Sequence, residues 1–135
     1  MAKNKQKYEL LAPAGSFPSL IAAVENRADA VYLGLKEFSM RALAHNFKLS
    51  DLKKVKEICN LRGKNGRKVR IYLTINTIIY DNEVKKIENI IKKVKSEKLA
   101  DAIICWDPSV IELCRKYNFP FHISTQASIA NEKAA

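Results

Sequence analysis

The sequence has 135 residues, of which 47% are hydrophobic, and this length and composition suit one globular domain and exclude wholesale disorder. No apolar run approaches the roughly 20 residues of a membrane span, and the basic N-terminus lacks the apolar core of a signal peptide. The net charge of +10 permits an acidic partner such as RNA, although solvated helix faces account for most of the lysines. We therefore expect a single domain over residues 1–135, in the cytoplasm, with no membrane contact.

The first third of the chain predicts a strand, a helix and a second strand. The run ELLAPA, residues 9–14, is typical of a strand. Ser16 has the side chain of a helix N-cap, and Pro18 is tolerated in the first turn of the helix that follows. The run AVYLG, residues 30–34, predicts the second strand.

The same plan repeats in the middle of the chain. Ser50 is predicted to cap a second helix, and Gly63 to end it. VRIYLTINTI, residues 69–78, predicts the third strand, after which Asp81 or Asn82 opens a third helix.

The last third adds two more strands. DAIICW, residues 101–106, predicts the fourth strand, and Asp107 followed by Pro108 is a strong start for a helix that reaches Tyr117. FHISTQ, residues 121–126, predicts the fifth strand. Helical crossovers between five strands imply a parallel sheet with right-handed connections.

The alternation of side chains helps to choose between an open doubly wound sheet and a (β/α) barrel. In the third strand the polar side chains share one face, and they are Arg70, Tyr72, Thr74 and Asn76. In the fifth strand His122, Ser124 and Gln126 also share one face. A polar face toward the carboxyl ends favours a partial TIM-like barrel of five parallel strands with flanking helices, with its site at the C-terminal rim. The first loop has only Gly15, so a dinucleotide fold is not supported.

Two stretches carry a resemblance to a known family. ELLAPAGSFPSLIAAVENRADAVYLGLKEFSMRALAHNF and FHISTQASIAN resemble motifs of the collagenase-like peptidase family U-32, at matching spacing. One departure is Arg27, where the family usually has Gly, so the helix-to-strand turn there is expected to be reshaped. The resemblance makes this chain the N-terminal portion of a longer barrel enzyme, or a shortened relative.

The resemblance also implies chemistry. Members are named proteases, yet several are implicated in hydroxylation of RNA bases or of ubiquinone precursors, some with an iron–sulfur cluster held by four cysteines. That cysteine-rich signature lies beyond the STQ motif, and Cys59, Cys105 and Cys114 do not match its ligands. We therefore expect no cofactor and no metal within this chain. A cluster would require cysteines supplied by a further C-terminal portion.

Candidate substrate-binding residues lie at the predicted rim. The residues are Arg41, Asn46, Asn76, Asp107, His122, Ser124 and Gln126. Gly15 and Ser16 are candidates for anion binding by backbone N–H groups at a helix start. Each has a plain structural alternative, such as a tight turn, a helix cap or a hydrogen-bonded core histidine, and their convergence on one rim favours function.

Two other features are weaker. Cys105 and His122 could be drawn as a thiol-protease pair, but a mid-strand thiol in an apolar run should be inert. The basic run RGKNGRKVR, residues 62–70, joins a helix to a strand on the side opposite the rim, and a solvated turn explains it better than RNA binding.

The function that the family resemblance implies is the substrate-side half of an RNA-base hydroxylation enzyme. A collagenase-like peptidase and a non-catalytic binding or assembly module remain alternatives, so the partner is RNA or a peptide. Closing a barrel takes about eight strands, and five leave two open edges. We expect self-association, or a missing portion of the protein, to cover the open side.

Overall fold

The fold is a single parallel sheet with helices between its strands. The structure is a computed structural model that describes residues 8–40, 46–61 and 67–135. The strands lie in the order of the sequence, and every neighbouring pair is parallel. They are β1 (Leu11–Pro13), β2 (Ala30–Gly34), β3 (Arg70–Ile75), β4 (Ala102–Cys105) and β5 (Phe121–Ile123). The predicted α/β class with five parallel strands is confirmed.

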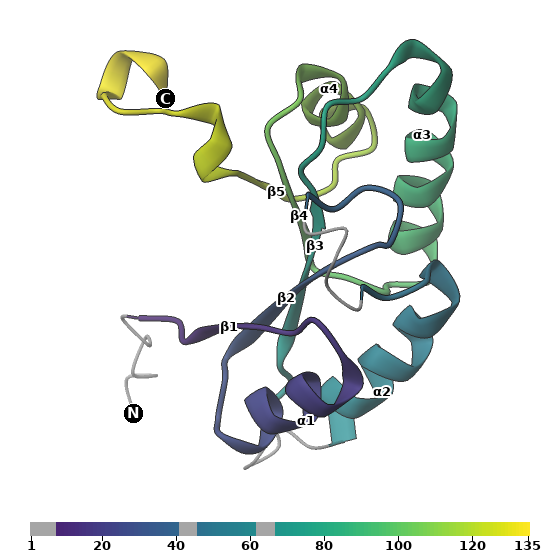
Figure 1. The fold of residues 1–135 in the computed structure, drawn as a ribbon, viewed down its shortest axis with the longest axis vertical. Coiled ribbons are helices and arrows are strands. Elements are labelled where there is room, and N and C mark those ends of the chain that lie inside the picture. The colour runs from purple at the N-terminus through teal and green to yellow at the C-terminus, as the bar shows by residue number, and fades with distance from the viewer. Residues whose placement is uncertain (1–7, 41–45, 62–66) are drawn as a thin grey trace.

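All four α-helices of the described residues lie on one side of this sheet (Figure 1). They are α1 (Phe17–Glu25), α2 (Leu52–Leu61), α3 (Asp81–Ser96) and α4 (Pro108–Lys116). Right-handed crossovers between strands that are also neighbours in the sheet place every helix on the same face. Within the described part of the chain, no α-helix covers the other face, and β1 and β5 are the two edges of an open sheet.

The strand side chains separate into two clusters by alternation. On the helix side, Val31, Ile71 and Ile103 belong to one large buried core. On the open side, a small cluster centres on Ala30, Tyr72 and Ala102, with Tyr32 and Ile104 packed against it. The predicted alternation of β3 is confirmed, but the middle of the open face is aromatic and aliphatic, and polar groups gather only toward its carboxyl end.

Three of the four predicted helix starts are confirmed, and one of them is Asp81, the first residue of α3. Ser16 caps α1 by accepting the amide of Ser19, with Pro18 in the first turn, and Asp107 caps α4. The prediction for Ser50 is wrong. Ser50 lies inside a short 3-10 turn that precedes α2, and the carboxylate of Asp51 accepts the amide of Lys48 at 2.8 Å. Gly63 lies outside the described residues.

The third and fifth strands are shorter than the sequence predicts. β3 ends at Ile75, because the amide of Asn76 turns away to the Phe38 carbonyl at 3.3 Å. β5 ends at Ile123, and Ser124 caps a 3-10 turn over Thr125–Ala127. Strand alternation therefore does not orient Asn76, Ser124 or Gln126; turns do.

Three helices end in the same backbone arrangement, with a non-glycine residue at positive φ. Arg27 has φ 66°, Lys98 φ 52° and Asn118 φ 47°. After α1, the Ala28 amide donates to the Ala23 carbonyl at 3.1 Å. This is the Schellman end, whose left-handed position is normally filled by glycine. The expected reshaping at Arg27 is not found: the arginine adopts the glycine conformation.

No α-helix within the described ranges is long and apolar enough to cross a membrane.

Candidate functional site

A cavity of about 510 Å³ opens on the helix-free face at the carboxyl ends of the strands. Its wall comes from the ends of β1 to β5, from the segment after β2 and from the turn after β5. Pro13, Tyr32, Thr74 and Ile104 form part of this wall. Cavities at this edge of parallel sheets are the usual place for ligands.

Five of the nine predicted site residues line this cavity. They are Gly15, Asn76, His122, Ser124 and Gln126. Ser16, Asn46 and Asp107 are not on its wall, and Arg41 lies outside the described residues. Asn46 is buried beside Phe47, whose amide donates to the carbonyl of Gly34 at 3.1 Å, so this asparagine lies close to the end of β2.

Asn76 is fixed at the end of β3 by three hydrogen bonds. Its Oδ1 accepts the amide of Met40 at 3.2 Å, and its carbonyl accepts Trp106 Nε1 at 2.7 Å. The third is the bond from its amide to Phe38. This pattern assigns the side-chain oxygen to Met40 and leaves Nδ2 as a hydrogen-bond donor.

Gln126 connects the turn after β5 to the segment after β2. Its Oε1 accepts the Ser124 hydroxyl at 2.7 Å, and its Nε2 lies 2.8 Å from the sulfur of Met40. Met40 therefore contacts side chains from both sides of the cavity, one from the end of β3 and one from the turn. These contacts hold the polar rim together across the sheet.

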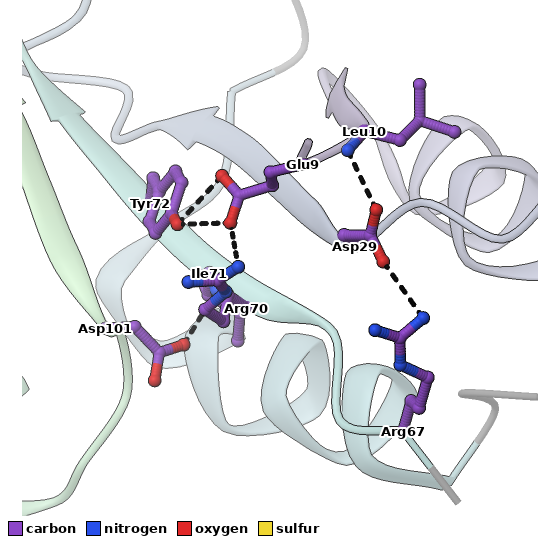
Figure 2. A network of polar contacts seen from close by, with 8 residues as sticks. All are labelled: Glu9, Leu10, Asp29, Arg67, Arg70, Ile71, Tyr72 and Asp101. Atoms are coloured by element: carbon purple, nitrogen blue, oxygen red, sulfur yellow. Dashed lines mark hydrogen bonds and ion pairs between the residues drawn. The ribbon is translucent and has the colours of Figure 1, made fainter. Parts of the chain in front are cut away.

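His122 packs edge-on against Tyr72, with ring centroids 4.7 Å apart. The Tyr72 hydroxyl donates to the carboxylate of Glu9, which also pairs with Arg70 (Figure 2). Burial, and next the bond to Glu9, raise the pKa of Tyr72 to about 12, so this phenol is neutral at ordinary pH. The predicted shared face of His122 and Tyr72 is confirmed.

The sequence interpretation missed two residues that shape the cavity. A Cβ at Gly34 would lie 2.5 Å from Ser39 Oγ and 3.0 Å from Thr74 Oγ1, so only glycine fits there. Thr74 is 7% exposed and donates to the Leu33 carbonyl at 3.2 Å. A glycine that ends an apolar strand is the signal that could have identified this close approach.

Asp107 has a structural role that uses its whole carboxylate. One oxygen accepts the amide and hydroxyl of Ser109, at 2.9 and 2.6 Å, and the other accepts the Ile79 amide at 3.0 Å. Burial opposes ionisation, but the bonds from Ser109 and Ile79 outweigh it and lower the pKa of Asp107. It caps α4 and ties the loop after β3 to that cap.

The three cysteines are buried thiols on the helix side. The pKa of Cys105 is raised by its hydrogen bond to Cys114 and by burial. The pKa of Cys59 is raised to about 12 by burial and by the nearby charge of Asp101. Cys105 pairs with Ile123 in the sheet register, so it lies on the face opposite His122. Cys105 and His122 therefore do not form a thiol–imidazole pair, as expected from the sequence.

The described part of the basic run before β3 is engaged in ion pairs at the amino end of the sheet (Figure 2). Arg67 lies 3.5 Å from Asp29, and Lys68 lies 3.5 Å from Asp101. Each carboxylate also accepts a backbone amide, from Leu10 and from Ile71, both at 2.8 Å. Residues 67–70 therefore anchor β1 and β3, and residues 62–66 lie outside the described part.

The fold and the cavity define an α/β protein with a concave site at the carboxyl edge of a parallel sheet, the edge where such sheets commonly bind ligands. The chain belongs to peptidase family U32, whose model matches residues 15–135.

Three relatives that are similar in sequence to this chain carry different names. A protein named collagenase from Porphyromonas gingivalis is 37% identical, over 97% of this chain and 30% of the relative. A tRNA hydroxylation protein P1 from Bacillus subtilis is 35% identical, over 96% of this chain and 30% of the relative. A 23S rRNA 5-hydroxycytidine C2501 synthase from Escherichia coli is 31% identical, over 100% of this chain and 19% of the relative.

The chain therefore spans less than a third of the length of these relatives. No solved structure matches it.

Proposed function

We propose that this chain forms the base-binding wall of an RNA-hydroxylation protein of the family. The observation that carries the proposal is the cavity at the carboxyl edge, where fixed amides from Asn76 and Gln126 lie beside aromatic rings. Relatives named for tRNA hydroxylation and for rRNA hydroxycytidine synthesis support the same substrate class.

The lining chemistry suits a nucleobase. Among the described lining residues none is Asp, Glu, Lys or Arg, so the cavity offers neutral donors and acceptors. Unstacked bases are recognised by hydrogen bonds to their edges and by stacking on aromatic rings. Tyr32 and His122 supply rings, while Asn76 and Gln126 supply amides that neighbouring groups hold in place.

The finer fold proposal is that this sheet is one segment of a (β/α) barrel. Sequential strand order with every helix on one face is the arrangement of such a segment. The open face would then be covered by the rest of a longer protein or by a second copy. Light scattering at micromolar concentration tests this: we expect dimers or larger species from residues 1–135, and a stable, cooperatively unfolding monomer would contradict it. We place this protein in the cytoplasm.

An iron–sulfur cluster does not fit the residues present. All three cysteines are buried, and no group of three metal-binding side chains occurs in the described ranges. Cys59 sits in α2, apart from the thiols of β4 and α4. We therefore assign no redox step to this chain, and its proposed contribution is to bind and orient the base.

The second candidate is a peptidase, and it rests on the names of two relatives, a collagenase and an uncharacterized protease. The cavity argues against it. Ser124 donates its hydroxyl to Gln126, and in the described part of the wall no serine hydroxyl is bonded to His122. A nucleophile with its general base is thus not assembled there. The third candidate, a binding or assembly module, requires neither chemistry.

RNA binding by cavity variants tests the proposal. We expect purified protein to bind labelled tRNA, and Asn76→Ala and Gln126→Ala to weaken binding about tenfold, because each removes a hydrogen bond to the base. Asn60→Ala is the matched control, since Asn60 is an exposed amide on α2. Cleavage of collagen or casein by the same preparation would favour the peptidase. The absence of both activities would leave the binding module.

A further inference from the structure

A second concavity, of about 570 Å³, lies beside the first on the helix side of the chain. It runs between α3 and the segments on either side of residues 41–45. We call it the lysine-rimmed groove, because four lysines surround it: Lys36, Lys48, Lys86 and Lys93. The buried part of its floor consists of Leu35, Phe38, Phe47 and Ile90.

The rim carries more positive charge than its neighbours neutralise. Lys86 pairs with Glu37, the one acidic residue of the described rim, and Lys93 reaches Glu97 only at 4.0 Å. The ammonium groups of Lys36 and Lys48 have no counter-ion within the described part of the chain, and both side chains are exposed. An anionic ligand would supply the missing charge.

The floor distinguishes this groove from an ordinary basic surface. Phe38 and Phe47 are each 3% exposed, and the Lys86 ammonium lies 5.6 Å from the centre of the Phe38 ring. Because the floor is apolar and the rim is positive, a ligand that combines an anion with an apolar part complements the groove. A nucleotide has both, with phosphate at the rim and base or sugar on the floor.

The position of the groove connects it to the proposed base cavity. Phe38 belongs to the groove, while Ser39 and Met40 belong to the cavity wall, so one short segment divides the two. An RNA strand with one base in the cavity would cross this segment and bring its next nucleotide to the groove.

We propose that the lysine-rimmed groove binds the nucleotide that flanks the modified base, with Lys36 and Lys48 on its phosphate. This inference rests on the proposed function. It adds that recognition extends beyond one base. The neutral cavity forms hydrogen bonds with the base, and the groove provides the positive charge that binds phosphate.

Binding of oligouridylates of one, three and five nucleotides tests the inference, with fluorescence anisotropy as the measurement. Wild-type protein should gain affinity from one to three nucleotides. The double variant Lys36→Ala/Lys48→Ala should bind the mononucleotide as wild type does and bind the longer strands about tenfold more weakly. Its slope of log affinity against log salt should fall by about 0.7 for each phosphate that the variant no longer neutralises.

A matched control is Lys85→Ala/Lys98→Ala, which removes two exposed lysines that do not line the groove. An equal weakening in this control would mean a general charge effect and overturn the inference. If Asn76→Ala weakens binding at all lengths while the groove variant matches wild type, the groove inference fails and the proposed function stands. If wild type binds no oligonucleotide, both fail.

A peptide probe completes the test. If a peptide of alternating Glu and Leu binds wild type but not the groove variant, while RNA binding is the same in both, the groove is a protein-docking site and the inference is overturned.

Discussion

Replacing Arg27 with glycine should stabilise the protein. Arg27 has φ 66° at the Schellman end of α1, and its side chain is exposed without an ion pair in the described part of the chain. Its Cβ is therefore held in a conformation that glycine adopts without steric conflict, and no ion pair of the side chain offsets that cost.

The size of the effect is a difference between two free energies. The left-handed conformation costs a residue with a Cβ about 1–2 kcal/mol. Glycine offsets about 0.4–1 kcal/mol of this gain in stability, because its greater flexibility lowers the free energy of the unfolded chain. Arg27→Gly should therefore raise the free energy of unfolding by about 0.5–1 kcal/mol, which for a domain of this size is a rise in Tm of about 2–4 °C.

Urea and thermal denaturation measure this change, and Arg27→Ala is the control that removes the side chain but keeps the Cβ. We expect the alanine variant to match wild type within about 0.5 kcal/mol. Asn118→Gly should gain less, because asparagine tolerates this region better than arginine. A glycine variant no more stable than the alanine variant would refute the strain argument.

Three further predictions concern stability and reactivity. Asp107→Ala should lower the free energy of unfolding by about 1–3 kcal/mol, because it removes a helix cap and the partner of the Ile79 amide. Asp107→Asn should be less destabilising, and equal effects of the two variants in urea melts would contradict this. Bonds from Lys116 and Tyr117 lower the pKa of Glu88 from 4.5 to about 2, so its stabilising contribution, present above pH 4.5, should disappear as the pH falls toward 2; a pH series of melts should show a flatter profile for Glu88→Gln. The buried cysteines should resist Ellman's reagent until the protein unfolds, and rapid labelling of the native state would show that the core opens.

Much of the fold followed from periodicity, because the strand and helix faces are dictated by burial. The alternation of β3 separated its polar and apolar side chains, and the apolar ones, such as Ile71 and Leu73, lie in the core. The caps at Ser16 and Asp107 followed from local hydrogen-bonding chemistry, which depends on few residues.

The failures occurred where another hydrogen bond competes with the pattern that the sequence suggests. Ser50 has the side chain of a cap, but the 3-10 turn is fixed by Asp51, which bonds back to Lys48. β3 ends early because Asn76 bonds to Phe38, which is distant in the sequence and is brought close by the segment after β2. Local propensity carries no information about a contact of this second kind.

The sequence predicted cavity-lining residues at the strand ends, and it missed Gly34, whose role depends on the close packing of neighbouring side chains. His122 and Asn76 line the cavity as expected, because polar residues at the carboxyl ends of parallel strands meet at one edge. The role of Gly34 depends on the 2.5 Å approach of Ser39 to an added Cβ, which no spacing in the sequence contains.

The strand order has a consequence for how the protein is made. Each strand pairs with the strand that precedes it in the chain, so every ladder joins neighbours in synthesis. A nascent chain can therefore add one βα unit at a time onto a partner that has already left the ribosome, without waiting for a later segment. The first and last ladders are the shortest, since β1 and β5 are three residues each, and the cavity wall is completed only when residues 121–126 emerge.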